Sequence, residues 1–189
     1  MNTPAHLIFG AGAFARPGAR RVTAAALLGA LLPDLSLYIL GSWALYVQQI
    51  PPQTVFNELY FSPGWQRIFA IDNSIPLWGA ICVLGLVLRR PAVTALGGAA
   101  LLHVLLDLPL HHDDGRPHFW PFSDWVFESP ISYWDSAQFA WIVAPLEGAA
   151  CLALVVLLWR RFDSWPLRGL FAVLLLAELW VIRQWLVFF

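Results

Sequence analysis

The chain has 189 residues, of which 59% are hydrophobic and 12% are charged, and its formal net charge is −1. Soluble domains are about 25% charged, so this composition excludes an ordinary soluble protein and indicates an integral membrane protein. The near-neutral charge gives no basic field for nucleic acid, so the lipid bilayer is the expected partner.

The first apolar stretch, residues 4–15, ends at Arg16 rather than at a small-residue cleavage site. We therefore expect a short N-terminal helix of the mature fold and not a signal peptide. Crossing a membrane takes ~20 apolar residues, and the chain has four stretches near or above that length and a shorter fifth. They lie at 22–46, 74–88, 92–110, 137–159 and 167–188. The sequence predicts one all-α domain over residues 1–189, a polytopic membrane helix bundle with about five transmembrane helices.

The placement of the arginines predicts the orientation of the bundle. The long connections 47–73 and 111–136 carry only Arg67 and Arg116. The short turns, at alternate ends of the spans, hold most of the others: Arg16, Arg20, Arg21, Arg89, Arg90, Arg160, Arg161 and Arg168. By the positive-inside rule, the short turns, the N-terminal one included, face the cytoplasm and the long loops face outside. We expect a protein of a bacterial inner or cell membrane.

His103 and Asp107 lie inside the apolar stretch 92–110. Residues four apart share one helix face, so both side chains can reach one point. Leaving such groups unpaired in hydrocarbon costs on the order of ~3 kcal/mol each. Three more histidines, His111, His112 and His118, follow closely. A metal ion is the favoured partner for His103 and Asp107, and a structural hydrogen-bonded His–Asp pair is the alternative; His118, before Phe119-Trp120, is expected at the membrane interface rather than as a ligand.

Further acids are expected at a similar depth in the bundle. A helix rises ~1.5 Å per residue, so the depth of a residue can be counted from the arginine turn that flanks its span. Residues 13 to 17 positions from such a turn are expected in one layer, in the outer half of the membrane. These groups are Asp34, Asp72, His103 and Glu147. Local explanations compete: a cap or kink at Pro33-Asp34, a helix cap at Glu147 and a solvated loop for His111 and His112.

Imidazole and carboxylate ligands without a thiolate suit zinc, with manganese or iron as lesser options. The excess of acids over histidines indicates more than one ion, because carboxylates bridge paired ions. Such a centre activates water for in-line attack on phosphorus. In this scheme Asp34 or Asp72 takes the proton of the water, and Arg116 or His118 binds the phosphate or protonates the leaving group.

His6, residues 29–34 (Gly-Ala-Leu-Leu-Pro-Asp), Asp72-Asn73-Ser74 and residues 102–107 together resemble the YdjM-like membrane-bound metal-dependent hydrolase family. That family is thought to be distantly similar to zinc-dependent phospholipase C and P1-type nucleases, which are all-helical phosphoesterases with two or three zinc ions. The resemblance implies these metal ligands: His6, Asp34, His103, Asp107, one of His111 or His112, and Glu147. The chain departs from the family at Ser36, where a second aspartate is usual, and at residues 72–74, where Thr-His-Ser is usual.

The leading hypothesis is a membrane-embedded zinc hydrolase with one to three ions. Its substrate would be a phosphoester in a lipid or amphiphile that enters from the outer leaflet. One alternative is a proton-coupled transporter or channel with a relay of buried acids, Asp34, Asp107, Glu147 and Glu178. The other is a non-catalytic membrane scaffold with a residual metal site.

Overall fold

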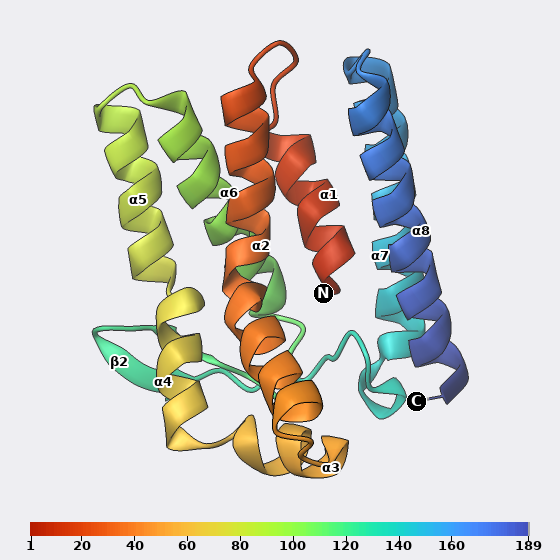
Figure 1. The fold of residues 1–189 in the computed structure, drawn as a ribbon. Coiled ribbons are helices and arrows are strands. Elements are labelled where there is room, and N and C mark those ends of the chain that lie inside the picture. The colour runs from red at the N-terminus through yellow and green to blue at the C-terminus, as the bar shows by residue number, and fades with distance from the viewer. Residues whose placement is uncertain (189) are drawn as a thin grey trace.

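The computed structural model describes residues 1–188, and it is 73% helical with 4% strand, so the all-α prediction is confirmed. The main helices, drawn in Figure 1, are α1 (Thr3–Phe14), α2 (Arg20–Ser42), α4 (Pro63–Asp72), α5 (Ile75–Val87), α6 (Pro91–Asp107), α7 (Ala140–Arg161) and α8 (Trp165–Phe188). The shorter helical elements are η1 (Trp43–Val47), α3 (Pro52–Thr54), η2 (Val55–Leu59) and η3 (Ser136–Gln138). The strands β1 (Pro117–Phe119) and β2 (Ser123–Val126) pair antiparallel.

Prolines and serines mark the starts of the helices. Pro63 and Pro91 stand in the first turns of α4 and α6, where a missing N–H costs nothing. The side chains of Ser62 and Ser74 cap α4 and α5 by accepting from the backbone N–H groups of Trp65 and Leu77.

Within residues 1–188, four helical segments are long and apolar enough to cross a membrane: Arg20–Val47, Pro63–Val87, Ala140–Arg161 and Trp165–Val187. The expected span 74–88 thus starts earlier, because α4 and α5 are separated only by Asn73 and Ser74. The expected span 92–110 is shorter, since α6 ends at Asp107 and Pro109 has no N–H to extend it. Exposed residues such as Val87, Leu146 and Leu176 give these helices apolar outer faces that suit lipid.

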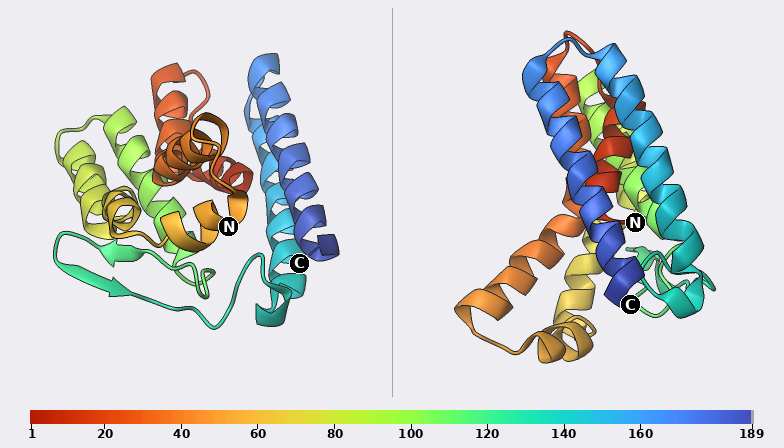
Figure 2. Two further views of the ribbon diagram at one scale, coloured as in Figure 1. Left: turned by 60° about the horizontal axis from the view of Figure 1, so that its bottom comes forward. Right: turned by 90° about the vertical axis from the view of Figure 1, so that its right-hand side faces the viewer.

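The helix α1 joins two parts of the molecule. It contacts α2 and α6 on one side and the α7–α8 hairpin on the other (Figures 1 and 2). A buried apolar cluster extends across this junction, with Ile8 from α1, Cys151 from α7 and Phe171 from α8 fully buried. The predicted short N-terminal helix is therefore central to the fold.

Two glycines allow α1, α2 and α6 to approach closely. A Cβ atom at Gly29 would lie 2.1 Å from the Leu96 carbonyl oxygen, and one at Gly10 would lie 2.7 Å from the Cβ atom of Ala30. Small residues at such crossings let helix backbones meet in membrane proteins. The close packing brings together the parts of the three helices that carry the polar residues.

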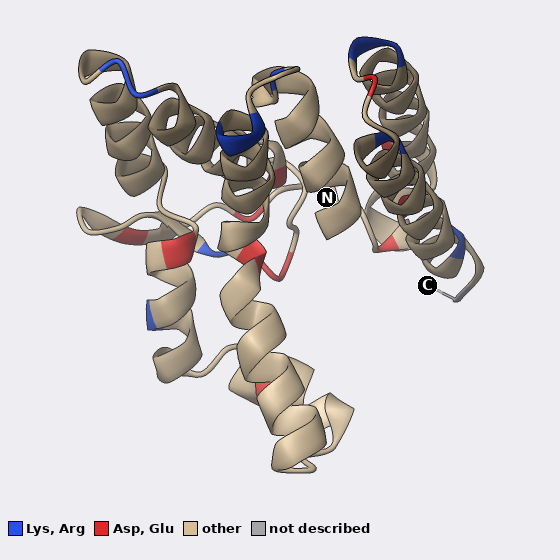
Figure 3. Ribbon diagram, turned by 45° about the horizontal axis from the view of Figure 1, so that its top comes forward, with Lys and Arg blue, Asp and Glu red and all other residues tan. Residues whose placement is uncertain are grey.

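The two long connections are more structured than the sequence predicted. Residues 47–73 contain α3, η2 and α4. Residues 111–136 contain the β1–β2 hairpin, which passes across one end of the bundle (Figure 2, left). The short turns that carry arginines gather at the other end, as Figure 3 shows.

Candidate metal centre

His6 from α1 and His103 and Asp107 from α6 converge in the interior of the protein. One ligand atom from each residue lies within 4.8 Å of the others, and all three residues are buried. His6 Nε2 lies 2.9 Å from Asp107 Oδ1, and His103 Nε2 lies 3.2 Å from Asp107 Oδ2. The two imidazole rings stack with 3.5 Å between their centroids. One carboxylate is thus shared by two parallel imidazoles.

The orientation of His103 is set by its second ring nitrogen. His103 Nδ1 lies 2.7 Å from the Ala30 carbonyl oxygen in α2. Because a carbonyl oxygen only accepts, Nδ1 carries the hydrogen, and Nε2 is left to face the carboxylates. His103 Nε2 is buried and has no hydrogen-bond partner of its own among the described residues. This is the arrangement in which a histidine typically binds a metal ion.

Asp34 adds a second carboxylate from α2. Asp34 Oδ1 lies 3.6 Å from His103 Nε2. The other oxygen, Oδ2, accepts a hydrogen bond from the Thr3 hydroxyl at 2.5 Å, and that hydroxyl lies 2.7 Å from the hydroxyl of Tyr38. We call His6, Asp34, His103 and Asp107 the His/Asp cluster.

Of the two neighbouring histidines, His111 is the one at the cluster. His111 Nε2 lies 3.5 Å from Asp107 Oδ2, and its Nδ1 lies 2.9 Å from Asp114 Oδ2. Burial alone would lower the pKa of His111, but the Asp107 and Asp114 carboxylates outweigh it and raise that pKa. His112 turns away, with its Nδ1 2.6 Å from the Ser129 carbonyl oxygen.

Arg116 lies beside the cluster, although it comes from the long connection. Its guanidinium is buried, with Nη1 3.7 Å from Asp34 Oδ1. Arg116 Nε donates to the Tyr60 hydroxyl at 3.2 Å, and Nη1 donates to Asn73 Oδ1 at 3.2 Å. Apart from Asp34, the partners of this cation are therefore neutral.

His118 is also brought near by the β1 strand. Its Nδ1 lies 3.1 Å from the Asn73 carbonyl oxygen, and the side chain is buried. Burial lowers the pKa of His118, so the imidazole is neutral near pH 7.

Two of the predicted site residues lie outside the cluster. Asp72 is half-buried and forms no ion pair among residues 1–188, whereas its neighbour Asn73 is buried and faces Arg116.

Glu147 is the second of these residues, and its Oε1 accepts from the backbone N–H of Asn2 at 2.9 Å. The side-chain amide of Asn2 donates to Glu178 Oε1 at 2.9 Å, and we call Glu147 and Glu178 the glutamate pair. The Met1 nitrogen lies 2.6 Å from Asp107 Oδ1, between the cluster and the pair.

Several residues at the site gave no signal in the sequence that pointed to it. Thr3, Tyr38 and Tyr60 are ordinary residues of helices and connections, and only the packing places them here. Asp114 is different, because it follows His111 by three residues within the His-His-Asp-Asp run and was therefore detectable.

An open, mainly apolar groove of about 330 Å³ lies beside the site. Its walls come from α1, α7 and the segment after α6, and the lining residues are Met1, Phe9, Leu110, Val143, Leu146 and Glu147. The groove is thus lined mainly by apolar side chains, and its lining includes Met1, which contacts Asp107.

Comparison with known proteins assigns no family to the chain. No family model, no curated protein and no solved structure matches it.

Proposed function

We propose that the protein is a membrane-embedded, metal-dependent hydrolase of a phosphoester in a lipid or amphiphile, related to the YdjM-like family. One observation carries the proposal: two imidazoles and two carboxylates from three helices converge on one buried point, where His103 Nε2 faces both carboxylates. Such a group of ionisable residues in the interior of a membrane protein is expensive unless it serves a function.

The donor set suits zinc, with manganese or iron as lesser options, because it offers nitrogen and oxygen atoms without a thiolate. His6, Asp34, His103 and Asp107 would hold one to three ions, and His111 would extend the site. When bound, zinc would polarise a phosphoryl group and promote the ionisation of water.

The chain's own residues would bind the substrate and move the protons. The buried Arg116 guanidinium offers a permanent cation for a phosphate oxygen next to Asp34. Asp34 would either hold an ion or accept a proton through Oδ1, since its Oδ2 is occupied by Thr3. His118, being neutral, is suited to accepting a proton rather than donating one.

The groove between α1 and α7 supports an amphiphilic substrate. Its apolar walls suit a hydrocarbon chain, and one of its lining residues, Met1, contacts Asp107 of the His/Asp cluster. With the arginine turns on the cytoplasmic side of a bacterial cell membrane, the cluster would lie toward the outer leaflet.

Metal analysis and turnover of the full-length protein test this function. The protein purified in a mild detergent should contain zinc, manganese or iron, and should hydrolyse an aryl phosphodiester or a phospholipid. A chelator should abolish hydrolysis and zinc should restore it. His103→Ala should lose both metal and activity, whereas the matched variant His112→Ala should keep both. A metal-free preparation that is indifferent to chelators would overturn the proposal.

A second candidate is a metal-binding scaffold without catalysis. It is favoured by Asn73, which stands where the family is expected to offer a histidine. The Asn73 side chain is already engaged, since it donates to the Phe69 carbonyl oxygen at 3.0 Å and accepts from Arg116. In that case the protein would bind metal and lose stability on His103→Ala, but no phosphoester would be turned over.

A further inference from the structure

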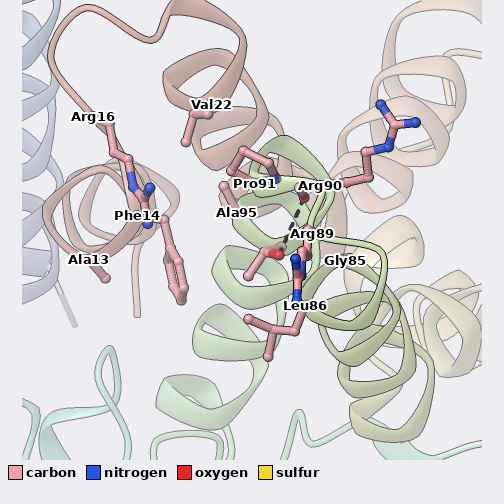
Figure 4. A pocket seen from close by; sticks show the side chains of 11 residues that line it. Ala13, Phe14, Arg16, Val22, Gly85, Leu86, Arg89, Arg90, Pro91 and Ala95 are labelled. Carbon is pink, nitrogen blue, oxygen red and sulfur yellow. Dashed lines mark hydrogen bonds between the residues drawn. The ribbon is translucent and has the colours of Figure 1, made fainter.

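A second cavity, of about 270 Å³, lies at the end of the bundle where the arginine turns gather. It is formed where α1 ends and where α5 turns into α6, as Figure 4 shows. Among its lining residues are Phe14, Arg16, Leu86, Arg89, Arg90 and Thr94. We call this cavity the arginine pocket. His103 lies thirteen positions after Arg90, which is about 20 Å along α6.

The positive charges of the arginine pocket are not balanced. No Asp or Glu belongs to the lining, and within residues 1–188 none of the three lining arginines forms an ion pair. Three arginines that line one cavity without an acid among the lining residues make its surroundings electropositive, and a bound anion would relieve the repulsion between these charges. The arrangement therefore favours an anionic ligand.

The backbone holds these arginines in defined places. The Arg16 carbonyl oxygen accepts from the Thr23 hydroxyl at 3.1 Å, and the Arg90 carbonyl oxygen accepts from the Thr94 hydroxyl at 3.3 Å. Arg89 has a φ of 52°, in the left-handed region that favours glycine. Arg89 thus occupies a backbone conformation in which glycine is usual, and its side chain lines the cavity.

The pocket also lies at the ends of two segments that are long and apolar enough to span a membrane. The segment Pro63–Val87 ends two residues before Arg89, and the segment Arg20–Val47 begins four residues after Arg16. Leu86 and Phe14 add apolar surface beside the charges. Basic pockets between membrane helices recognise anionic headgroups, and guanidinium groups match phosphate geometry.

We propose that the arginine pocket binds the phosphate-bearing headgroup of an anionic phospholipid. Arg16, Arg89 and Arg90 neutralise the phosphate, and Leu86 and Phe14 contact the first part of the acyl chains. The combination of cationic and apolar lining at a membrane edge favours a lipid over free phosphate. This site is separate from the His/Asp cluster and does not depend on the hydrolase proposal.

Native mass spectrometry of the full-length protein, titrated with phosphatidylglycerol or phosphatidylcholine in neutral detergent, tests this site. The triple variant R16Q/R89Q/R90Q removes the lining charges. Its matched control, R20Q/R21Q/R160Q, removes three charges from the same end of the bundle that do not line the cavity. We expect at least tenfold weaker phosphatidylglycerol binding in the pocket variant only, since each basic residue near an anionic lipid surface contributes about fivefold. Phosphatidylcholine binding should be the same in all three proteins.

Two outcomes would overturn the proposal. In one, both triple variants lose phosphatidylglycerol equally, which would indicate a diffuse charge effect. In the other, inorganic phosphate displaces the lipid completely at equal concentration, which would indicate a site for the free ion. Thermal unfolding in phosphatidylcholine verifies that the variants fold. If the pocket variant does not fold, R16Q/R90Q against R20Q/R160Q makes the same comparison.

Discussion

Two groups of buried ionisable residues flank the N-terminal end of α1, and they differ in composition. The His/Asp cluster lies between α1, α2 and α6 and combines imidazoles with carboxylates. The glutamate pair lies on α7 and α8 and has only carboxylates, which share the Asn2 amide. Similar depth in the bundle is therefore not sufficient to make Glu147 part of the metal centre. The donor types and the partners decide which group can bind a metal.

The largest contrast is expected from Asp107→Asn against Glu147→Gln. Asp107 contacts His6, His103 and His111, so its neutralisation should lower metal affinity by at least ~100-fold. Residues that only hydrogen-bond to a metal ligand contribute about 10- to 100-fold. Glu147→Gln should leave metal content unchanged, because Glu147 contacts Asn2 instead. Elemental analysis after dialysis measures both. Equal metal loss in the two variants would show that Asp107 and Glu147 belong to one metal site, which would contradict the separation of the two groups.

Removal of the metal by a chelator should lower thermal stability only where the His/Asp cluster is intact. A ligand present at 100 times its dissociation constant stabilises the folded state by about 2.7 kcal/mol, so chelation should lower the thermal stability of the wild-type protein. The same loss should appear in Glu147→Gln and should vanish in Asp107→Asn. Thermal unfolding with and without chelator gives the comparison, and a chelator effect that survives in Asp107→Asn would contradict it.

Asp114→Asn should have a smaller effect on the cluster. Asp114 lies against the far nitrogen of His111, and removal of such an outer partner weakens metal binding by about 10- to 100-fold. Asp113→Asn is the matched control, since Asp113 is exposed and neighbours it in the chain. Competition with a fluorescent zinc chelator measures the affinity. Unchanged zinc affinity in Asp114→Asn would show that His111 is not a metal ligand.

The smallest effect is expected from amide substitution in the glutamate pair. Glu147→Gln keeps an oxygen that can accept from Asn2 and removes a like charge near Glu178, so stability should change by no more than about 1 kcal/mol. Denaturant unfolding measures the change. A loss of several kcal/mol in Glu147→Gln, together with stabilisation of the wild type but not of the variant by added cation, would show that the pair itself holds an ion.

Local sequence patterns were sufficient for much of the fold and for part of the site. Long apolar stretches determine membrane-length helices, because a backbone in hydrocarbon must satisfy its hydrogen bonds internally. The spacing of His103 and Asp107 determines that they share a helix face, since the helical period is 3.6 residues. The same pattern predicted the helix of residues 4–15, although not its central position.

Only the tertiary structure decided which neighbouring residue faces the site. His111 and His112, like Asp72 and Asn73, are adjacent in the chain. The sequence left His111 and His112 as equal candidates and favoured Asp72 over Asn73. The packing of the connections turns His111 and Asn73 inward and leaves His112 and Asp72 aside. Likewise, the insertion of α1 between two helix groups gave Glu147 a partner in Asn2 rather than in the cluster. These outcomes depend on contacts between residues far apart in the sequence, which periodicity and composition do not determine.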